Sequence, residues 1–301
     1  NASIIERAML RRWLLALLAA LLLGGCSGPA RQQATPAVWV VRSPGTTIYL
    51  TGTVHLLPDG MEWRHGPITR AIIDAEELVT ELAPAELARA AKVMRLFSRG
   101  NSPVEPRERF DRDLREDYIA LEADILGKGS RLAALDDWAL ALMLARVNAD
   151  QAGLRPANGV DGALIGIFAA AGKPRRGLET AEDQFGAFDA IPLREQRVML
   201  NRLMRDMAEG RADDRLHATV SAWARGDMEA LAQIIARDAR DAPTAQRLLL
   251  IDRNLQWAGW IAQRLKRPGK VLIAVGAGHF AGPGSLLALL EEQGIKAERL
   301  Q

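Results

Sequence analysis

The feature that most constrains the fold of this chain is a pair of apolar segments, one near each end, that both finish in Gly-x-x-His. Segment 47–55 reads Thr-Ile-Tyr-Leu-Thr-Gly-Thr-Val-His, and segment 271–279 reads Val-Leu-Ile-Ala-Val-Gly-Ala-Gly-His. Each predicts a strand followed by a glycine turn. Because ligands bind outside the carboxyl ends of strands in open α/β sheets, His55 and His279 are candidates to share one metal ion or one substrate. The alternative is that each imidazole is buried and bonded to a backbone carbonyl.

The composition limits what the protein does. Of its 301 residues, 49% are hydrophobic and 25% are charged, which is typical of a globular protein. The formal net charge is +2 and aromatic residues make up 5%, without interleaved basic residues, so we expect no nucleic-acid partner. The only cysteine is Cys26, which excludes an intrachain disulfide and a cysteine-based zinc site.

Residues 1–26 predict a signal peptide. Arg11 and Arg12 precede an apolar run over residues 13–23, which is too short for a comfortable membrane span and fits the apolar part of a signal peptide. The chain does not open with methionine, and we expect Met9 to be the true start.

The predicted signal peptide ends in Leu-Gly-Gly-Cys26, which resembles a bacterial lipobox. The resemblance implies that Cys26 becomes the lipidated first residue of the mature protein, so the membrane is a partner through this anchor. The alternative is an ordinary signal peptide with a chance cysteine. Ser27 carries no negative charge, which by the same resemblance indicates an outer-membrane lipoprotein facing the periplasm. Residues 27–37 are small, polar and proline-bearing, and they predict a flexible tether.

The rest of the chain predicts an α/β fold. Strand-like runs occupy residues 38–42, 46–50, 77–82, 175–179, 271–275 and 296–300. Apolar residues at helical spacing predict helical insertions at about 85–152 and 181–265. We therefore expect one domain over residues 38–301. Its central, mostly parallel sheet is built from both ends of the chain and flanked by helices, with a large, mainly helical block in the middle.

Carboxylates near predicted strand ends are further site candidates. Glu81 lies near the end of strand 77–82, on a short apolar run, although a solvated glutamate on an edge strand gives the same pattern. Glu179 ends strand 175–179. Asp161 opens a helix and is either its cap or a site residue.

Arg253 and Asn254 form a polar pair on an otherwise apolar helix that precedes the second Gly-x-x-His segment. Since a guanidinium can hold a carboxylate at two points, we expect the pair to support the site. The alternative is a surface arginine and a solvated asparagine. The motif glycines Gly52 and Gly276 are also candidates, because glycine lets another group approach the backbone closely.

These segments together resemble the TraB/GumN family, which is related to the Tiki proteins. The resemblance covers most of the chain after the tether and rests on the order and spacing of short motifs: Gly52-Thr-Val-His55, the strand ending in Glu81, Gly159-Val-Asp161, Leu178-Glu179-Thr180, Arg253-Asn254 with Trp257, and Val275-Gly-Ala-Gly-His279-Phe-Ala-Gly282. It implies that the two Gly-x-x-His motifs and a glutamate form the functional core. In the Tiki branch that core is linked to divalent-metal-dependent proteolysis. The fold is also shared with haem-binding and erythromycin-esterase-like relatives, so one scaffold hosts different chemistry.

The expected activity is metal-dependent hydrolysis of a peptide or amide bond in the cell envelope, with Mn, Co or Zn as the cofactor and a peptide or small molecule as the substrate. Two imidazoles and a carboxylate suit such ions, so we expect His55, His279 and Glu81 to hold the metal. Glu81 is either a ligand or the base for the metal-bound water. The alternative is a non-catalytic envelope lipoprotein that binds metal, haem or a partner. Glu81 distinguishes the two alternatives, because a hydrolase needs a carboxylate at the metal or its water, whereas an axial haem site needs only histidine and an apolar pocket.

Overall fold

The computed structural model describes residues 32–98, 104–126 and 131–300. Residues Gln33–Gln301 form one compact unit. The predicted signal peptide, the proposed lipidation site Cys26 and residues 27–31 of the tether lie outside the described residues. Within the described part of the chain, every helix is too short or too polar to cross a membrane.

The last part of the predicted tether is folded. Strand β1 (Gln32–Gln33) pairs with β4 (Met61–Glu62) in a separate two-stranded sheet. Ala34 is fully buried, and its N–H donates to the carbonyl of Glu62 (2.8 Å). The tether prediction for residues 32–37 is therefore corrected, because small side chains such as Ala34 fit into the core as well as into a linker.

The main sheet has six strands. Their spatial order is β6 (Arg175–Glu179), β5 (Glu77–Leu82), β7 (Gly269–Gly276), β3 (Thr46–Thr53), β2 (Val38–Ser43) and β8 (Glu298–Leu300). Strands β6, β5, β7 and β3 are parallel, whereas β2 is antiparallel to both of its neighbours. Strands from both ends of the chain lie side by side in this sheet, which confirms the predicted α/β fold.

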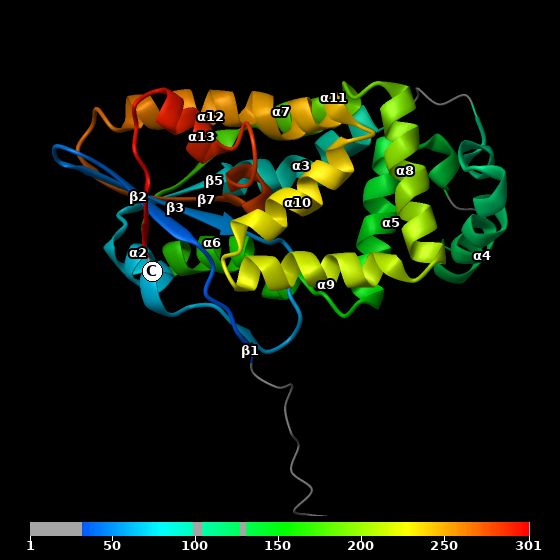
Figure 1. The fold of residues 1–301 in the computed structure, drawn as a ribbon, viewed down its shortest axis with the longest axis horizontal. Helices are drawn as coiled ribbons and strands as arrows, with labels where there is room; N and C mark the ends of the chain where they lie inside the picture. The colour runs from blue at the N-terminus through cyan, green and yellow to red at the C-terminus, as the bar shows by residue number, and fades with distance from the viewer. Residues whose placement is uncertain (1–31, 99–103, 127–130, 301) are drawn as a thin grey trace, which may run out of the picture. The chain divides into compact units, whose positions relative to one another are not determined.

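Helices cover both faces of the sheet. In Figure 1, α12 (Asp252–Arg264) and α13 (Leu286–Glu292) lie above it, and α2 (Gly66–Asp74), α6 (Val160–Ala170) and α9 (Arg211–Ala224) lie below it. The central strand β7 is buried on both faces, which explains its continuous apolar sequence. Val271 and Ile273 pack in one core with Trp257, and Leu272 packs in the other with Phe168.

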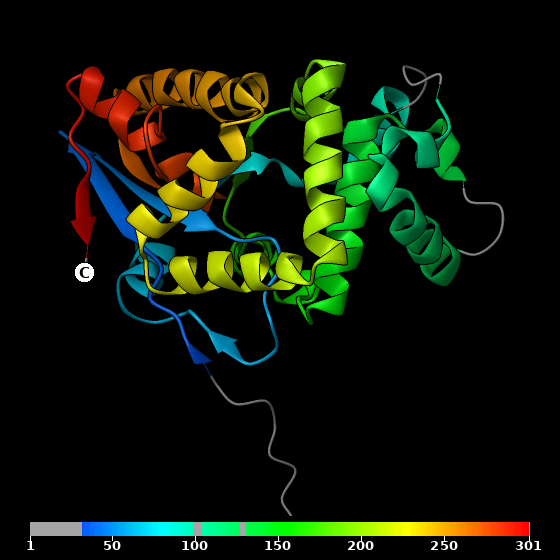
Figure 2. The same cartoon turned by 45° about the vertical axis from the view of Figure 1, so that its right-hand side comes forward.

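The helical block lies beyond the carboxyl ends of the parallel strands (Figure 2). Its helices are α3 (Pro84–Phe97), α4 (Arg115–Leu126), α5 (Asp137–Gln151), α7 (Ala181–Asp189), α8 (Leu193–Ala208), α10 (Met228–Ala239) and α11 (Pro243–Gln246). Short turns connect the elements: the 3-10 helices η1 (Pro106–Arg109), η2 (Arg112–Leu114), η3 (Arg131–Ala134), η4 (Pro156–Asn158) and η6 (Ala277–Phe280), and the π-helical η5 (Arg247–Ile251). The described parts of segments 85–152 and 181–265 are thus largely helical, as predicted.

Helix α6 begins earlier than predicted. Gly159 is its N-cap and Val160 its first residue, whereas the sequence pattern made Asp161 a candidate for the cap. Asp161 lies inside the first turn, and no side chain caps this helix. The helix-cap interpretation of Asp161 is therefore wrong.

Candidate active site at the carboxyl edge of the sheet

Each of the four parallel strands brings a candidate residue to the same edge of the sheet. Strand β3 leads to His55, β5 carries Glu81, β6 ends at Glu179 and β7 leads to His279. Parallel strands share one carboxyl edge, so segments far apart in the sequence meet there.

Glu81 is buried at this edge, with 11% of its side chain exposed, because β5 lies between β6 and β7. Its Oε1 accepts the N–H of Gly276 (2.8 Å), and its Oε2 accepts from Arg253 Nη2 (2.7 Å) and Gln184 Nε2 (3.0 Å). Burial raises the pKa of Glu81, but the charge of His279, which is protonated only in acid, the charges of Arg253 and His55 and the Gly276 N–H outweigh it and lower the pKa to about 2. Glu81 is therefore ionised at neutral pH.

Arg253 joins two carboxylates. Its Nη2 also donates to Glu179 Oε1 (2.7 Å) and its Nε to Glu179 Oε2 (2.9 Å), while Nη1 donates to the carbonyl of Leu249 (2.8 Å). Nη1 lies 3.3 Å from Nε2 of His279. Burial raises the pKa of Glu179, although Arg253 acts against this rise. The guanidinium is 12% exposed, so the surface-arginine alternative is wrong.

Asn254 fixes the tautomer of His279. The amide Nδ2 of Asn254 donates to the carbonyls of Gly284 (2.9 Å) and His279 (3.4 Å), so its Oδ1 accepts the Nδ1 proton of His279 at 2.7 Å. The Nε2 atom is left without a proton, 3.9 Å from Glu81 Oε1. Burial lowers the pKa of His279 to about 3, so the ring is neutral at pH 7. The Trp257 ring lies 4.3 Å away between centroids.

His55 has the opposite environment, because 70% of its side chain is exposed. Its Nδ1 lies 2.9 Å from Oδ2 of Asp161, whose Oδ1 accepts from Thr53 Oγ1 (2.6 Å). The hydrogen bond to Asp161 raises the pKa of His55 to about 9. Smaller effects on the pKa of His55 come from the charge of Glu81, which raises it, and from that of Arg253, which lowers it.

Two glycines allow backbone segments to approach closely at this edge. A Cβ on Gly52 would lie 2.8 Å from Cα of Ala277, in the turn that carries His279. A Cβ on Gly159 would overlap the carbonyl oxygen of His55. Any larger residue at either position would push a histidine-bearing segment away from the sheet.

The structure brings most of the sequence-predicted residues together. One network contains Glu81, Glu179, Arg253, Asn254, Gly276 and His279, and a second contact joins Asp161 to His55. Sequence reasoning missed Thr53 and Gln184. The Gln184 amide donates to both Glu81 and Glu179 (3.1 Å), and the available signal was its place in the first turns of α7, just after strand-end Glu179.

The predicted metal ligands do not form a ready-made metal site. Among the described residues, no group of three or more His, Cys, Asp or Glu side chains is placed to hold a metal ion. Arg253 contacts Glu81 and faces Nε2 of His279, and both oxygens of Glu81 already accept hydrogen bonds. The donor chemistry still fits in part. His55 and His279 are both held through Nδ1 by a polar side chain, as metal-binding histidines commonly are.

A comparison with protein-family models matches the region that contains this site. A model of the TraB/PrgY/gumN family matches residues 37–299, which include both Gly-x-x-His motifs. No curated protein and no solved structure matches the chain.

Proposed function

The chain belongs to the TraB/PrgY/gumN family, and on that premise we propose that the carboxyl edge of its sheet is the active site of a divalent-metal-dependent hydrolase. The proposed substrates contain peptide or amide bonds, and the proposed metals are Mn, Co and Zn. One observation carries the proposal: His55 and His279 are both held through Nδ1, near ionised Glu81. Two Nε2 atoms and one carboxylate are thereby offered on one edge of the sheet.

The residues around the imidazoles orient them. Asn254 holds His279 in the tautomer whose Nε2 carries no proton, and Asp161 orients the ring of His55. His279 needs no deprotonation before it binds a ligand, because its pKa is about 3. His55 must release a proton first, since Asp161 raises its pKa to about 9.

Glu81 suits a ligand role better than a base role. A general base is most effective when its pKa lies near the working pH, and the pKa of Glu81 is about 2. Arg253 keeps this carboxylate ionised and has a guanidinium at the edge of the sheet. We propose that the same guanidinium stabilises negative charge on the substrate carbonyl oxygen.

In this proposal His55, His279 and Glu81 hold the metal, which when bound supplies a water of lowered pKa and polarises the carbonyl. The described residues are not arranged as such a group. Metal content is therefore measured together with hydrolysis, so that binding and turnover are tested separately.

The test loads the protein with Mn, Co or Zn in turn and measures bound metal and peptide hydrolysis. His55→Ala and His279→Ala should each lose both. Glu81→Gln should weaken metal binding and abolish hydrolysis, whereas a base role would leave the metal in place. The matched control is His217→Ala, on the exposed side of α9, which should change neither. Unchanged metal content in both site-histidine variants would overturn the metal site.

The second candidate is a non-catalytic protein that binds metal, haem or an envelope partner. The hydrogen bonds that already occupy both oxygens of Glu81 favour it, because a hydrolase needs this carboxylate at the metal or its water. A metal-loaded wild type that is inert on broad peptide and ester libraries would support this candidate over the hydrolase.

We also propose that a lipid on Cys26 anchors the protein to the outer membrane, facing the periplasm. The support is the sequence alone, which reads Leu-Gly-Gly-Cys26-Ser after an apolar run. The variant Cys26→Ser should accumulate as an unlipidated precursor. Fatty-acid labelling of that variant would show the anchor assignment to be wrong.

A further inference from the structure

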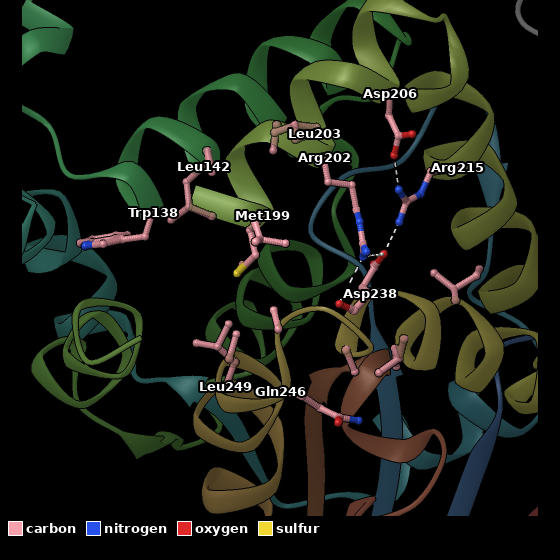
Figure 3. A pocket seen from close by; sticks show the side chains of 18 of the residues that line it. Trp138, Leu142, Met199, Arg202, Leu203, Asp206, Arg215, Asp238, Gln246 and Leu249 are labelled. Carbon is pink, nitrogen blue, oxygen red and sulfur yellow. Dashed lines mark hydrogen bonds and ion pairs between the residues drawn. The ribbon is translucent and has the colours of Figure 1, made fainter. Parts of the chain in front are cut away.

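Helices of the block line an open cavity of about 510 Å³. Figure 3 shows side chains of α5, α8, α9, α10 and the turn from α11 into η5 around it. Its walls are mainly apolar and include Leu142, Met199, Leu203, Ile234, Ile235 and Leu249. This volume lies within the range of about 300–1,000 Å³ that small-molecule pockets occupy. His55, Glu81 and His279 do not line it, but the cavity adjoins the candidate active site, because its lining residues Ile235 and Leu250 lie against Gly278, next to His279.

One end of the cavity is charged (Figure 3). Arg215 makes ion pairs with Asp206 and Asp238, and Arg202 Nη1 lies 3.5 Å from Asp238 Oδ1. The side chains of Arg202 and Arg215 are about a quarter exposed. An apolar chamber thus ends in a half-buried network of guanidinium groups.

A second pocket, of about 500 Å³, adjoins the cavity at this network. Arg202, Asp206 and Arg215 line both spaces. Seven arginines and three aspartates line the second pocket, and no glutamate or lysine does. Carboxylates pair with five of these arginines, so the attraction for an anion comes from the other two, Arg237 and Arg240. We call this second pocket the arginine pocket.

Two of its arginines are available to an anion. Arg237 and Arg240, near the end of α10, are exposed and have no ion pair or side-chain hydrogen bond within the part of the chain that the structure describes. The other arginines of the pocket already have aspartate partners. A guanidinium binds a carboxylate or phosphate at two points, so Arg237 and Arg240 can receive such a group.

We propose that the two spaces together bind a single-chain anionic amphiphile, a long-chain carboxylate, with its alkyl chain in the apolar cavity and its head in the arginine pocket. The apolar walls account for the chain. The guanidinium groups of Arg237 and Arg240 account for the sign of the head. Arg202 and Arg215 stand where the lining changes from apolar to charged, which is where such a molecule changes from chain to head.

The ligand series uses the full chain and isothermal titration calorimetry with dodecanoate. Dodecanoate should bind in a one-to-one ratio. Decanoate should bind roughly fifteenfold more weakly, because it lacks two methylenes and each one removed from an apolar site weakens binding about fourfold. Butanoate should show no binding. Dodecyltrimethylammonium has the same chain and the opposite charge, and it should bind at least about tenfold more weakly than dodecanoate.

Two variants separate the chain site from the head site. Ala239→Phe fills the cavity from α10 and should abolish dodecanoate binding, whereas Ala236→Phe, on the exposed side of the same helix, should not. The double variant Arg237→Ala, Arg240→Ala should weaken dodecanoate binding about tenfold and leave dodecan-1-ol binding unchanged.

The control for the head site is the double variant Arg70→Ala, Arg95→Ala, which removes two exposed arginines outside both spaces and should bind dodecanoate like the wild type. Unchanged dodecanoate affinity in Ala239→Phe would overturn the chain site, and equal affinities for dodecanoate and dodecyltrimethylammonium would overturn the head site. Thermal unfolding checks that each variant folds. If Ala239→Phe does not fold, the chain-length series on the wild type decides.

Discussion

Two buried arginine–carboxylate networks, one at the sheet edge and one in the helical block, have different partners. At the sheet edge Arg253 holds Glu81 and Glu179 and faces the unprotonated Nε2 of His279. In the helical block the fully buried Arg109 lies 3.5 Å from Asp137, and its Nε and Nη1 donate to the backbone carbonyls of Val104 and Leu135.

The two networks differ in whether they leave a group free to bind a ligand. Asp137 also accepts from Arg197 Nε (2.6 Å), so its carboxylate has two guanidinium partners, both from the helical block. At the sheet edge, Nε2 of His279 has a lone pair, and the nearby His55 is largely exposed. We infer that the block network holds helices together, whereas the sheet-edge network is arranged to receive a ligand. Each prediction below tests this contrast.

The largest effect is expected from Asp137→Ala. It leaves Arg109 buried without its carboxylate, which should lower the free energy of unfolding by about 3–5 kcal/mol. Urea unfolding measures the loss, and Asp213→Ala, on the exposed side of α9, is the control that should change little. A loss below about 1 kcal/mol would remove the structural role of this network.

Acid should act mainly on the sheet-edge network. The pKa of His279 is about 3 in the fold and 6.5 in an unperturbed histidine, so between these values only the unfolded chain binds the proton. The free energy of unfolding should fall by up to about 1.4 kcal/mol per pH unit as pH drops from 6.5 toward 3. Glu81 adds to this fall in stability. Its depressed pKa contributes stability that is fully present above pH 4.5 and is lost as pH drops from 4.5 to about 2.

Unfolding of chelator-treated protein at several pH values measures this slope. His279→Gln should flatten it between pH 6.5 and 3, and the exposed His217→Gln should not. His55 acts in the other direction, because a pKa raised to about 9 contributes stability that is lost as pH rises through that value. An equal slope in the wild type, His279→Gln and His217→Gln would show that groups other than His279 cause the acid sensitivity.

A smaller effect is expected from Gly52→Ala. The new Cβ would meet the backbone of Ala277 at 2.8 Å, so we expect a loss of about 1–3 kcal/mol and displacement of the turn that carries His279. Gly162→Ala in α6 is the matched control, since its Cβ has no neighbour within 4 Å. That control should stabilise the protein by about 0.5–1 kcal/mol in thermal unfolding. Equal stability of the two variants would contradict the close contact between Gly52 and Ala277.

The smallest change in stability is expected from Asp161→Asn. His55 and Asp161 form a solvent-accessible pair, so the free energy of unfolding should change by less than about 1 kcal/mol. The pKa of His55 should nevertheless fall, because the carboxylate that raises it is gone. An NMR titration of the imidazole measures the shift. An unchanged pKa would show that Asp161 does not orient this ring.

The sequence by itself determined the local elements and the edge at which the site lies. The strand predicted over residues 77–82 is β5 at the same bounds, and the one over 175–179 is β6. Pro84 follows the first of these runs, and Pro174 and the helix-capping Thr180 flank the second, so local sequence marks both strands. Parallel strands share a carboxyl edge, so the meeting of Glu81, Glu179 and His279 could be predicted as well.

Only the tertiary structure decided the environment of each charge. The segment over residues 105–117 has the composition of a solvated helix face, yet it buries Arg109, because its partner Asp137 comes from another helix. The two Gly-x-x-His motifs show the same limit. His279 is covered by α12 and has a pKa of about 3, whereas His55 lies exposed beside Asp161 and has a pKa of about 9. A pKa depends on the groups packed around the ring, and distant parts of the chain supply those groups.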